Sequence, residues 1–149
     1  MRRKIYKHII EQRENQRKSL AVLLDPQEVH EADRLRHIVD LATASGIDYF
    51  FVGGSLVTDP DITDLIDMVR QTSDIPILSF PGSNLQISYR VDALLFLSLI
   101  SGRNPEYLIG QHVPVSLSLK KSGLEVIPTG YLLVDGGRQT AVSYLSFTP

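Results

Sequence analysis

The chain has 149 residues, enough to build one hydrophobic core of ordinary size. Hydrophobic residues make up 43% of it and charged residues 21%, and its formal net charge of -2 gives no general attraction for nucleic acid or for anionic membranes. The absence of cysteine excludes disulfides, thiolate metal sites and a cysteine nucleophile. No apolar run reaches the ~18 residues that cross a bilayer, and the first residues lack the apolar core of a signal peptide, so a cytoplasmic protein is expected.

The first 18 residues predict an amphipathic helix rich in positive charge. Ile5, Tyr6, Ile9 and Ile10 recur at helical spacing, and Lys and Arg outnumber Glu in this segment. One interpretation is attraction to an acidic lipid surface or to phosphates. The favoured interpretation is a solvated face on a helix that closes one end of the core.

Strands and helices then alternate along the chain. Strands are expected over 20–25, 48–55, 75–83, 92–101 and 124–137. Helical segments between them are expected over 30–46, ending at Gly46; over 58–74, with Asp59 as cap before Pro60; and over 103–123, capped by Asn104 and interrupted at Pro114. No helix is expected after the fifth strand.

Five apolar strands separated by helical segments predict a parallel sheet with right-handed crossovers in a single α/β unit. Two architectures fit this pattern. An open doubly wound sheet of five strands would be complete at this length. A closed (β/α)8 barrel needs ~250 residues, so this chain would supply its first five strands.

Small and polar residues follow each expected strand, at the sheet edge where both architectures bind ligands. These are Asp25; Gly53, Gly54 and Ser55; Pro81, Gly82 and Ser83; Ser101, Gly102, Arg103 and Asn104; and Asp135, Gly136 and Gly137. Small residues let a ligand approach the backbone, whose N–H groups bind phosphate. A carboxylate and a hydroxyl on neighbouring strands suit Mg²⁺. A second interpretation of Asp25 is that it caps the helix after Pro26.

Other functional motifs are absent from the sequence. It contains no GxGxxG, no P-loop and no nucleophile elbow. The four histidines are scattered, so a structural metal site built from them is not expected. Because no aromatic platform accompanies a basic stripe, nucleic-acid binding is not expected either.

Five segments resemble one enzyme family in their order and spacing. They read "LLDP", "FVGGS", "FPGS", "DALLFLSLISGRNPEYLIGQHV" and "IPTGYLLVDGG". They are similar to the prenylglyceryl phosphate synthases, a family that includes geranylgeranylglyceryl phosphate synthase and the heptaprenyl enzyme of some bacteria. The resemblance covers residues 20–145. It implies a TIM barrel, truncated here to the amphipathic helix of residues 1–18 and the first five β/α units in residues 19–149.

The resemblance also implies a reaction of ether-lipid biosynthesis. A geranylgeranyl or other prenyl group would pass from its diphosphate to the 3-hydroxyl of sn-glycerol 1-phosphate, with Mg²⁺ stabilising the departing pyrophosphate. Asp25 and Ser55 would be the metal ligands. Further substrate contacts are expected at Gly53, Gly54, Pro81, Gly82, Ser83, Arg103 and Asn104. Phe80, Phe96 and Tyr131 are candidates for the walls of a hydrocarbon groove, although ordinary core packing is the favoured interpretation for each.

Two alternatives remain open for Ser83 and Asn104. Ser83 donates to a phosphate or satisfies its own turn, and Asn104 faces the site or serves only as a helix cap. The family resemblance further implies self-association into a homo-oligomer, and the lipid substrate suggests peripheral membrane contact.

The chain also departs from the family pattern. The family often continues its first motif as Asp-Pro-Asp-Lys, whereas this chain has Asp25, Pro26, Gln27 and Glu28. The family's glycerol phosphate cradle belongs to strands six to eight, which these residues do not include. A non-catalytic remnant, a half-barrel that needs a second chain, and a complete doubly wound phosphate-binding domain are therefore the alternatives to an active transferase.

Overall fold

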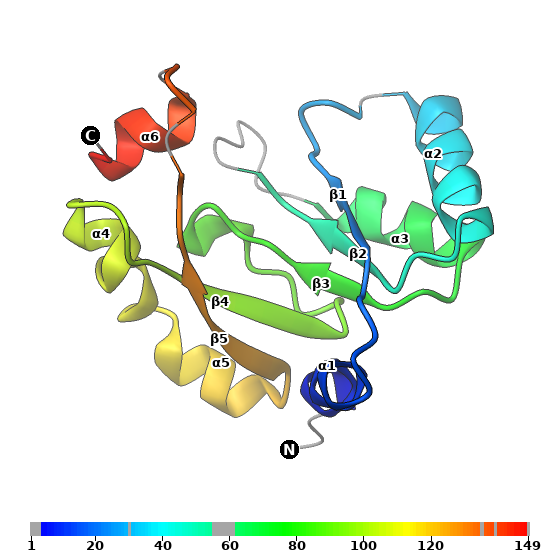
Figure 1. Cartoon of the computed structure of the whole chain (residues 1–149), viewed down its shortest axis with the longest axis horizontal. Helices are drawn as coiled ribbons and strands as arrows, with labels where there is room; N and C mark the ends of the chain where they lie inside the picture. Colours follow the sequence, from blue (N-terminus) through cyan, green and yellow to red (C-terminus); the bar gives the residue numbers. More distant parts are fainter. Residues whose placement is uncertain (1–3, 30, 55–61, 135, 139, 149) are drawn as a thin grey trace.

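The computed structural model describes residues 4–29, 31–54, 62–134, 136–138 and 140–148, and it shows an α/β fold around one parallel sheet (Figure 1). The five strands are β1 (Ala21–Leu24), β2 (Tyr49–Val52), β3 (Ile77–Ser79), β4 (Ala93–Leu99) and β5 (Glu125–Tyr131). They lie in the order β1-β2-β3-β4-β5, and each neighbouring pair is parallel.

The strand order decides between the two predicted architectures. A doubly wound sheet reverses its order at a switch point, where the chain returns to the other side of the first strand. In the described residues each strand instead pairs with the next strand in sequence, as in the wall of a β/α barrel. The doubly wound alternative is therefore wrong.

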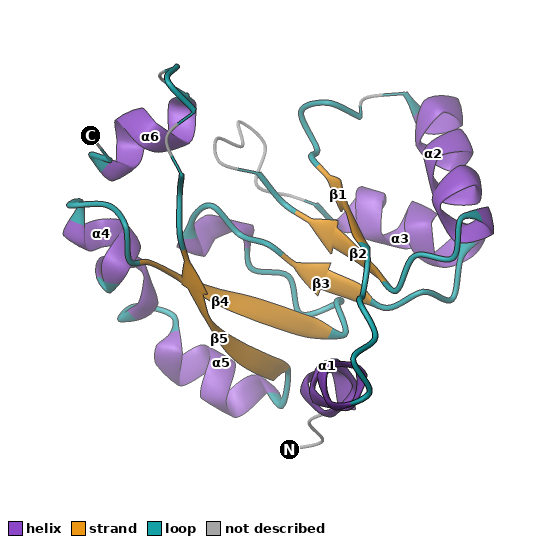
Figure 2. Ribbon diagram, viewed as in Figure 1, coloured by secondary structure: helices purple, strands orange, loops and turns teal. Residues whose placement is uncertain are grey.

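Side chains alternate between two faces of the sheet and form two hydrophobic clusters. The outer face carries Phe50 and Leu94 and packs against α2 (Ala32–Ala44), α3 (Thr63–Thr72) and α5 (Ser116–Ser122). Figure 2 shows α2 and α3 beside strands β1–β3, with α4 and α5 beside β4 and β5. The inner-face cluster consists of Tyr49, Leu78, Ala93, Leu95 and Ile127.

Helix α1 (Lys4–Glu14) covers the inner face where the strands begin. Its Ile5 and Ile9 pack against the inner-face cluster, and the buried carboxylate of Glu125 accepts the backbone N–H groups of Ile5 at 3.1 Å and Tyr6 at 2.8 Å. The helix is shorter than the 18 residues expected, but it closes one end of the core as predicted. Since its apolar side is in contact with the sheet, that side is not available for insertion into a bilayer.

Several local predictions are confirmed. Gly46 follows α2 with φ +71°, and Asn104 caps α4 (Pro105–Leu108) by accepting the N–H of Glu106. Pro114 separates the 3-10 helix η2 (Gly110–His112) from α5. Asp59 and Pro60 lie outside the described residues, within which α3 begins at Thr63.

Two expectations for the strand lengths and the connections are wrong. The predicted strand 124–137 pairs only as far as Tyr131, because its partner β4 ends opposite, at Leu99. A short helix, α6 (Ala141–Ser146), follows β5 behind a Thr140 cap, where no helix was expected. Between β3 and β4, where no helix had been predicted either, the described residues form only the 3-10 turn η1 (Asn84–Gln86).

Part of β4 has no neighbouring strand on one side among the described residues, because β3 ends at Ser79. β3 pairs with β4 only through Leu78↔Ala93 and Ser79↔Leu94, whereas β5 follows β4 to its end. Residues 95–99 therefore pair with β5 alone, and their other edge, on the side of β3, is unpaired. None of the helices in the described ranges is long and apolar enough to cross a membrane.

Candidate functional site

Asp25 stands at the end of β1 and is held in a turn. Its Oδ1 accepts the N–H of Gln27 at 3.0 Å, and its carbonyl oxygen accepts the N–H of Glu28 at 3.0 Å. Helix α2 begins at Ala32, behind Glu31 as its N-cap residue. The interpretation of Asp25 as a cap for this helix is therefore wrong. The turn instead holds a half-buried carboxylate at the carboxyl end of the first strand.

The Asp25 carboxylate lies directly against Gly54, at the end of the neighbouring strand. A Cβ atom on Gly54 would lie 2.7 Å from both Cγ and Oδ1 of Asp25, closer than atoms in contact allow. Only glycine leaves room for this carboxylate. Ser55, the predicted partner of Asp25 in binding metal, is the next residue and lies outside the described residues.

Gly53 has a different role from Gly54. Its φ of +145° favours glycine, and a Cβ atom on it would collide with the carbonyl oxygen of Phe80. Phe80 in turn donates its N–H to Val52 at 2.8 Å. Gly53 therefore permits close approach of the chains that leave β2 and β3.

The turn after β3 satisfies much of its own hydrogen bonding. The N–H of Gly82 donates to Oε1 of the buried Gln86 at 2.9 Å, and Ser83 Oγ accepts the N–H of Leu85 at 3.3 Å, which caps η1. For Ser83 the structure thus shows the turn interaction. Pro81, Gly82 and Ser83 all line the cavity described below, and their contact with a substrate stays a prediction.

Asn104 ties the segment after β4 to α6. Its Oδ1 accepts the N–H of Glu106 at 3.1 Å and its Nδ2 donates to the carbonyl of Leu145 at 2.7 Å. The backbone N–H groups of Arg103 and Asn104 both donate to the carbonyl of Ser146. Asn104 thus uses both ends of its side chain within the protein, while the Arg103 side chain is exposed. Substrate contacts at either residue stay predictions.

An apolar cavity opens at the carboxyl ends of the strands. Its lining residues are Gly54, Phe80, Pro81, Gly82, Ser83, Asn84, Ile87, Phe96, Leu97, Leu99, Tyr107, Gln111, His112, Val115, Tyr131, Val142, Leu145 and Ser146. Phe96 and Leu97 lie on opposite faces of β4, so the cavity passes around the edge of β4 that β3 leaves unpaired.

Aromatic side chains form much of the cavity wall. Phe80 stacks on Phe51 with ring centroids 5.9 Å apart and meets Tyr131 edge to face at the same distance. Toward the helical layer, Phe96 meets the ring of His112 edge to face at 4.3 Å. Phe80, Phe96 and Tyr131, for which core packing was the favoured interpretation, therefore all border the cavity.

The helical side of this cavity was not predicted from the sequence. Tyr107, Gln111 and Val115 recur every fourth residue and line it, although Pro114 interrupts the helix between them. His112 Nε2 lies 3.3 Å from Ser98 Oγ. The four-residue spacing was the available signal, but the proline break obscured the periodicity.

The comparisons with known proteins agree with this architecture. The model of the PcrB family matches residues 9–147. The chain belongs to the PcrB family. This PcrB-family chain is 52% identical, over 99% of its length, to the geranylgeranylglyceryl phosphate synthase of Chitinophaga pinensis, and 37% identical, over 89% of its length, to that of Korarchaeum cryptofilum. It covers 58% and 54% of those two relatives.

Solved structures that resemble this chain are also geranylgeranylglyceryl phosphate synthases. The crystal structure of (S)-3-O-geranylgeranylglyceryl phosphate synthase from Thermoplasma acidophilum, in complex with its substrate sn-glycerol-1-phosphate, matches 97% of this PcrB-family chain with a TM-score of 0.86 and 29% identity. The chain covers 57% of that structure. It thus spans a little over half the length of its relatives, and the family resemblance inferred from the sequence is confirmed.

Proposed function

We propose that this chain is part of an enzyme that transfers a geranylgeranyl group from its diphosphate to the 3-hydroxyl of sn-glycerol 1-phosphate. The relatives carry the name of this activity, and the matched Thermoplasma acidophilum structure holds sn-glycerol-1-phosphate. One observation in this chain carries the proposal: an apolar cavity opens beside the Asp25 carboxylate and Gly54 at the ends of the strands. The five β/α units are proposed to be the first five of a (β/α)8 barrel.

The cavity suits a hydrocarbon chain. Its lining residues in the described part of the chain include no Asp, Glu, Lys or Arg, and aromatic and aliphatic side chains predominate. A prenyl chain in the cavity would bury apolar surface at ~25 cal/mol per Å². We place its diphosphate at the end near Gly54, because the carboxyl ends of parallel strands are where such folds bind phosphates.

Mg²⁺ is the proposed metal, held by Asp25 and Ser55. Carboxylate and hydroxyl oxygens fit the preference of this ion, which binds through few protein groups and shares substrate phosphates. No cluster of three or more His, Asp or Glu that could hold a metal occurs in the described ranges, so the substrate and water would complete the shell. When bound, the ion would neutralise charge on the departing pyrophosphate. The chain's own contribution is the turn at Gln27, which orients the carboxylate, and the space beside Gly54.

We propose that the glycerol phosphate is held by segments outside these 149 residues, as the family pattern implies. A half-barrel that functions only with a second chain is the alternative. Exposed apolar residues lie at both sheet edges and would be covered in either case; they include Leu23 on β1 and Leu132 and Val134 after β5. Whether the missing part belongs to the same polypeptide or to a second chain, we predict that the 149-residue chain alone binds prenyl diphosphate without transferring the prenyl group. A homo-oligomeric state and a cytoplasmic location also remain predictions.

Calorimetric titration with geranylgeranyl diphosphate tests the metal assignment. Asp25→Asn is expected to weaken binding in Mg²⁺ by about 100-fold or more, because the amide supplies no charge to the ion. Asp33→Asn is the matched control, since Asp33 is exposed on α2 and its ion-pair partner among the described residues is Arg36. Unchanged affinity in Asp25→Asn would refute the metal site. Product formation from sn-glycerol 1-phosphate by the 149-residue chain alone would refute the proposal that the glycerol phosphate is held by segments outside it.

A further inference from the structure

The segment that spans α4, η2 and α5 has an uncharged centre. Residues 107–119 contain no Asp, Glu, Lys or Arg, although charged residues make up 21% of the whole chain. A helical layer that faces water normally carries charged side chains on its outer side. The composition of this segment therefore indicates that its outer side meets something other than water.

The two sides of this segment are both apolar. Tyr107, Gln111 and Val115 face the cavity, whereas Ile109, Val113 and Leu117 point away from the protein. The outward side chains are 61%, 67% and 61% exposed and also recur every fourth residue. With Leu108, which is 45% exposed, they form what we call the outer apolar strip.

Positive charge stands at both ends of the outer apolar strip. Arg103 is exposed before α4, and Lys120 and Lys121 are exposed in the last turn of α5. The acid nearest to the strip in sequence is Glu106, whose carboxylate lies against Gly110 and accepts a hydrogen bond from Gln111 at 3.5 Å. Apolar side chains between cationic ends match the layers of an anionic membrane, where hydrocarbon lies beneath phosphate.

We propose that the outer apolar strip docks on the surface of an anionic lipid bilayer. This inference rests on the proposed function, because a prenyl diphosphate is an amphiphile that partitions into membranes. The strip and the cavity wall are two sides of the same helical segment, so docking brings the cavity to the bilayer surface. The hydrocarbon chain then enters without crossing bulk water.

Charge complementarity favours a bilayer over a second copy of the chain. Another copy would present the same uncharged centre and the same cations, whereas anionic headgroups attract Arg103, Lys120 and Lys121 together. Helix α1 is the other basic, amphipathic element, but its Ile5 and Ile9 already pack on the inner face of the sheet.

Vesicle flotation tests the proposal with the whole chain. Vesicles of phosphatidylcholine and phosphatidylglycerol in equal parts are the probe. The double variant Ile109→Ser, Val113→Ser is expected to lower partitioning at least about tenfold, since two apolar anchors are lost. Leu41→Ser is the matched control: Leu41 is likewise 61% exposed, but it lies on α2. A second variant, Lys120→Gln with Lys121→Gln, should lower binding about tenfold on the same vesicles and change nothing on pure phosphatidylcholine.

Binding of geranylgeranyl diphosphate in solution, measured on the same variants, separates this inference from the proposed function. Retained binding with lost flotation supports the docking surface. A wild-type chain that does not float, or a Leu41→Ser loss equal to that of the double variant, overturns it. A double variant that floats normally but has a smaller mass in sedimentation also overturns it, because the strip would then join copies of the chain. Flotation without any prenyl diphosphate binding refutes the proposed function and leaves the docking surface standing.

Discussion

The carboxylate of Glu125 accepts the backbone N–H of Tyr6 at 2.8 Å, joining the first helix to the start of the fifth strand across 119 residues. The same carboxylate accepts the N–H of Ile5, so it satisfies two of the free donors at the N-terminus of α1. A negative charge at this end of a helix is also favoured by the helix dipole. Glu125 is buried, and this tertiary contact supplies acceptors of the kind that a local cap provides.

Glu125→Gln is therefore expected to lower the free energy of unfolding by about 1–2 kcal/mol, because an amide offers only one acceptor oxygen and no charge. Urea denaturation measures this change. Glu11→Gln, an exposed substitution on the same helix, is the control and should change stability little. Faster hydrogen exchange at the Ile5 and Tyr6 amides should accompany the loss, and equal stability of both variants would contradict the capping role.

Gly54→Ala should affect binding more than stability. The new methyl group would displace the Asp25 carboxylate, whose side chain can rotate away, so the stability cost is about 1 kcal/mol. The Mg²⁺-dependent affinity for geranylgeranyl diphosphate should fall about as far as in Asp25→Asn. Gly136→Ala is the control, because a Cβ atom there meets no atom of the described residues within 4 Å. Wild-type affinity in Gly54→Ala would show that the position of the Asp25 carboxylate against Gly54 is not needed.

Gly53→Ala, unlike Gly54→Ala, should mainly reduce the stability of the fold. It combines an unfavourable φ with a collision against the carbonyl oxygen of Phe80, which belongs to the backbone and cannot rotate away. A loss of about 3 kcal/mol or more is expected in chemical denaturation. Gly123→Ala separates the two causes, since Gly123 has φ +75° but open space around it, and should cost about 1 kcal/mol. Similar losses in the two variants would exclude the collision as the main cause.

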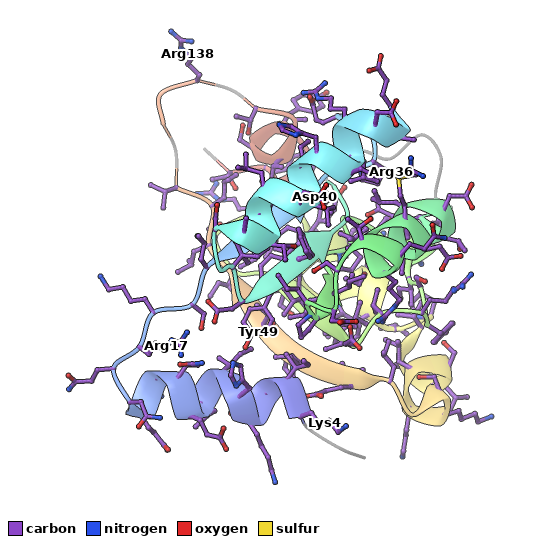
Figure 3. The ribbon with its side chains drawn as sticks, turned by 90° about the vertical axis from the view of Figure 1, so that its right-hand side faces the viewer. Lys4, Arg17, Arg36, Asp40, Tyr49 and Arg138 are labelled. Carbon is purple, nitrogen blue, oxygen red and sulfur yellow. The ribbon has the colours of Figure 1, made fainter. Side chains whose placement is uncertain are left out.

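Tyr49 should make stability depend on alkaline pH. Its side chain lies between the sheet and α1 (Figure 3). The ring meets that of His8 edge to face, and the hydroxyl has no hydrogen-bond partner in the described part of the chain. Burial, with a smaller contribution from the Asp48 carboxylate, raises the pKa of Tyr49 above its ordinary value of 10.0. The unfolded chain therefore loses this proton first, and stability falls as pH rises from 10.0 through the raised pKa.

Tyr49→Phe should remove that part of the pH dependence, as followed by denaturation at a series of alkaline pH values. At neutral pH it should be neutral or stabilise by up to about 1 kcal/mol, because an unpaired buried hydroxyl is removed. Tyr89→Phe, at an exposed position, is the control and should leave the pH dependence in place. A large loss of stability in Tyr49→Phe at neutral pH would mean that the hydroxyl has a partner after all.

The sequence by itself determined the features that depend on neighbours a few residues away. Gly46 ends a helix, Asn104 caps one and Pro114 interrupts one, each through backbone geometry or hydrogen bonds within a single turn. The alternation of strands and helices and the family motifs were also readable, since apolar periodicity is local. α6 was missed because six residues are too few to display a helical period.

Tertiary structure alone decided what depends on residues distant in the chain. The sheet order excluded the doubly wound fold, and the end of β3 at Ser79 left one edge of β4 unpaired beside the cavity. The tertiary structure also gave Gly53 and Gly54 different roles, because Gly53 faces the backbone of Phe80 and Gly54 faces the carboxylate of Asp25. Such contacts form only when the chain has packed, and no local pattern records which distant atom will fill the space beside a glycine.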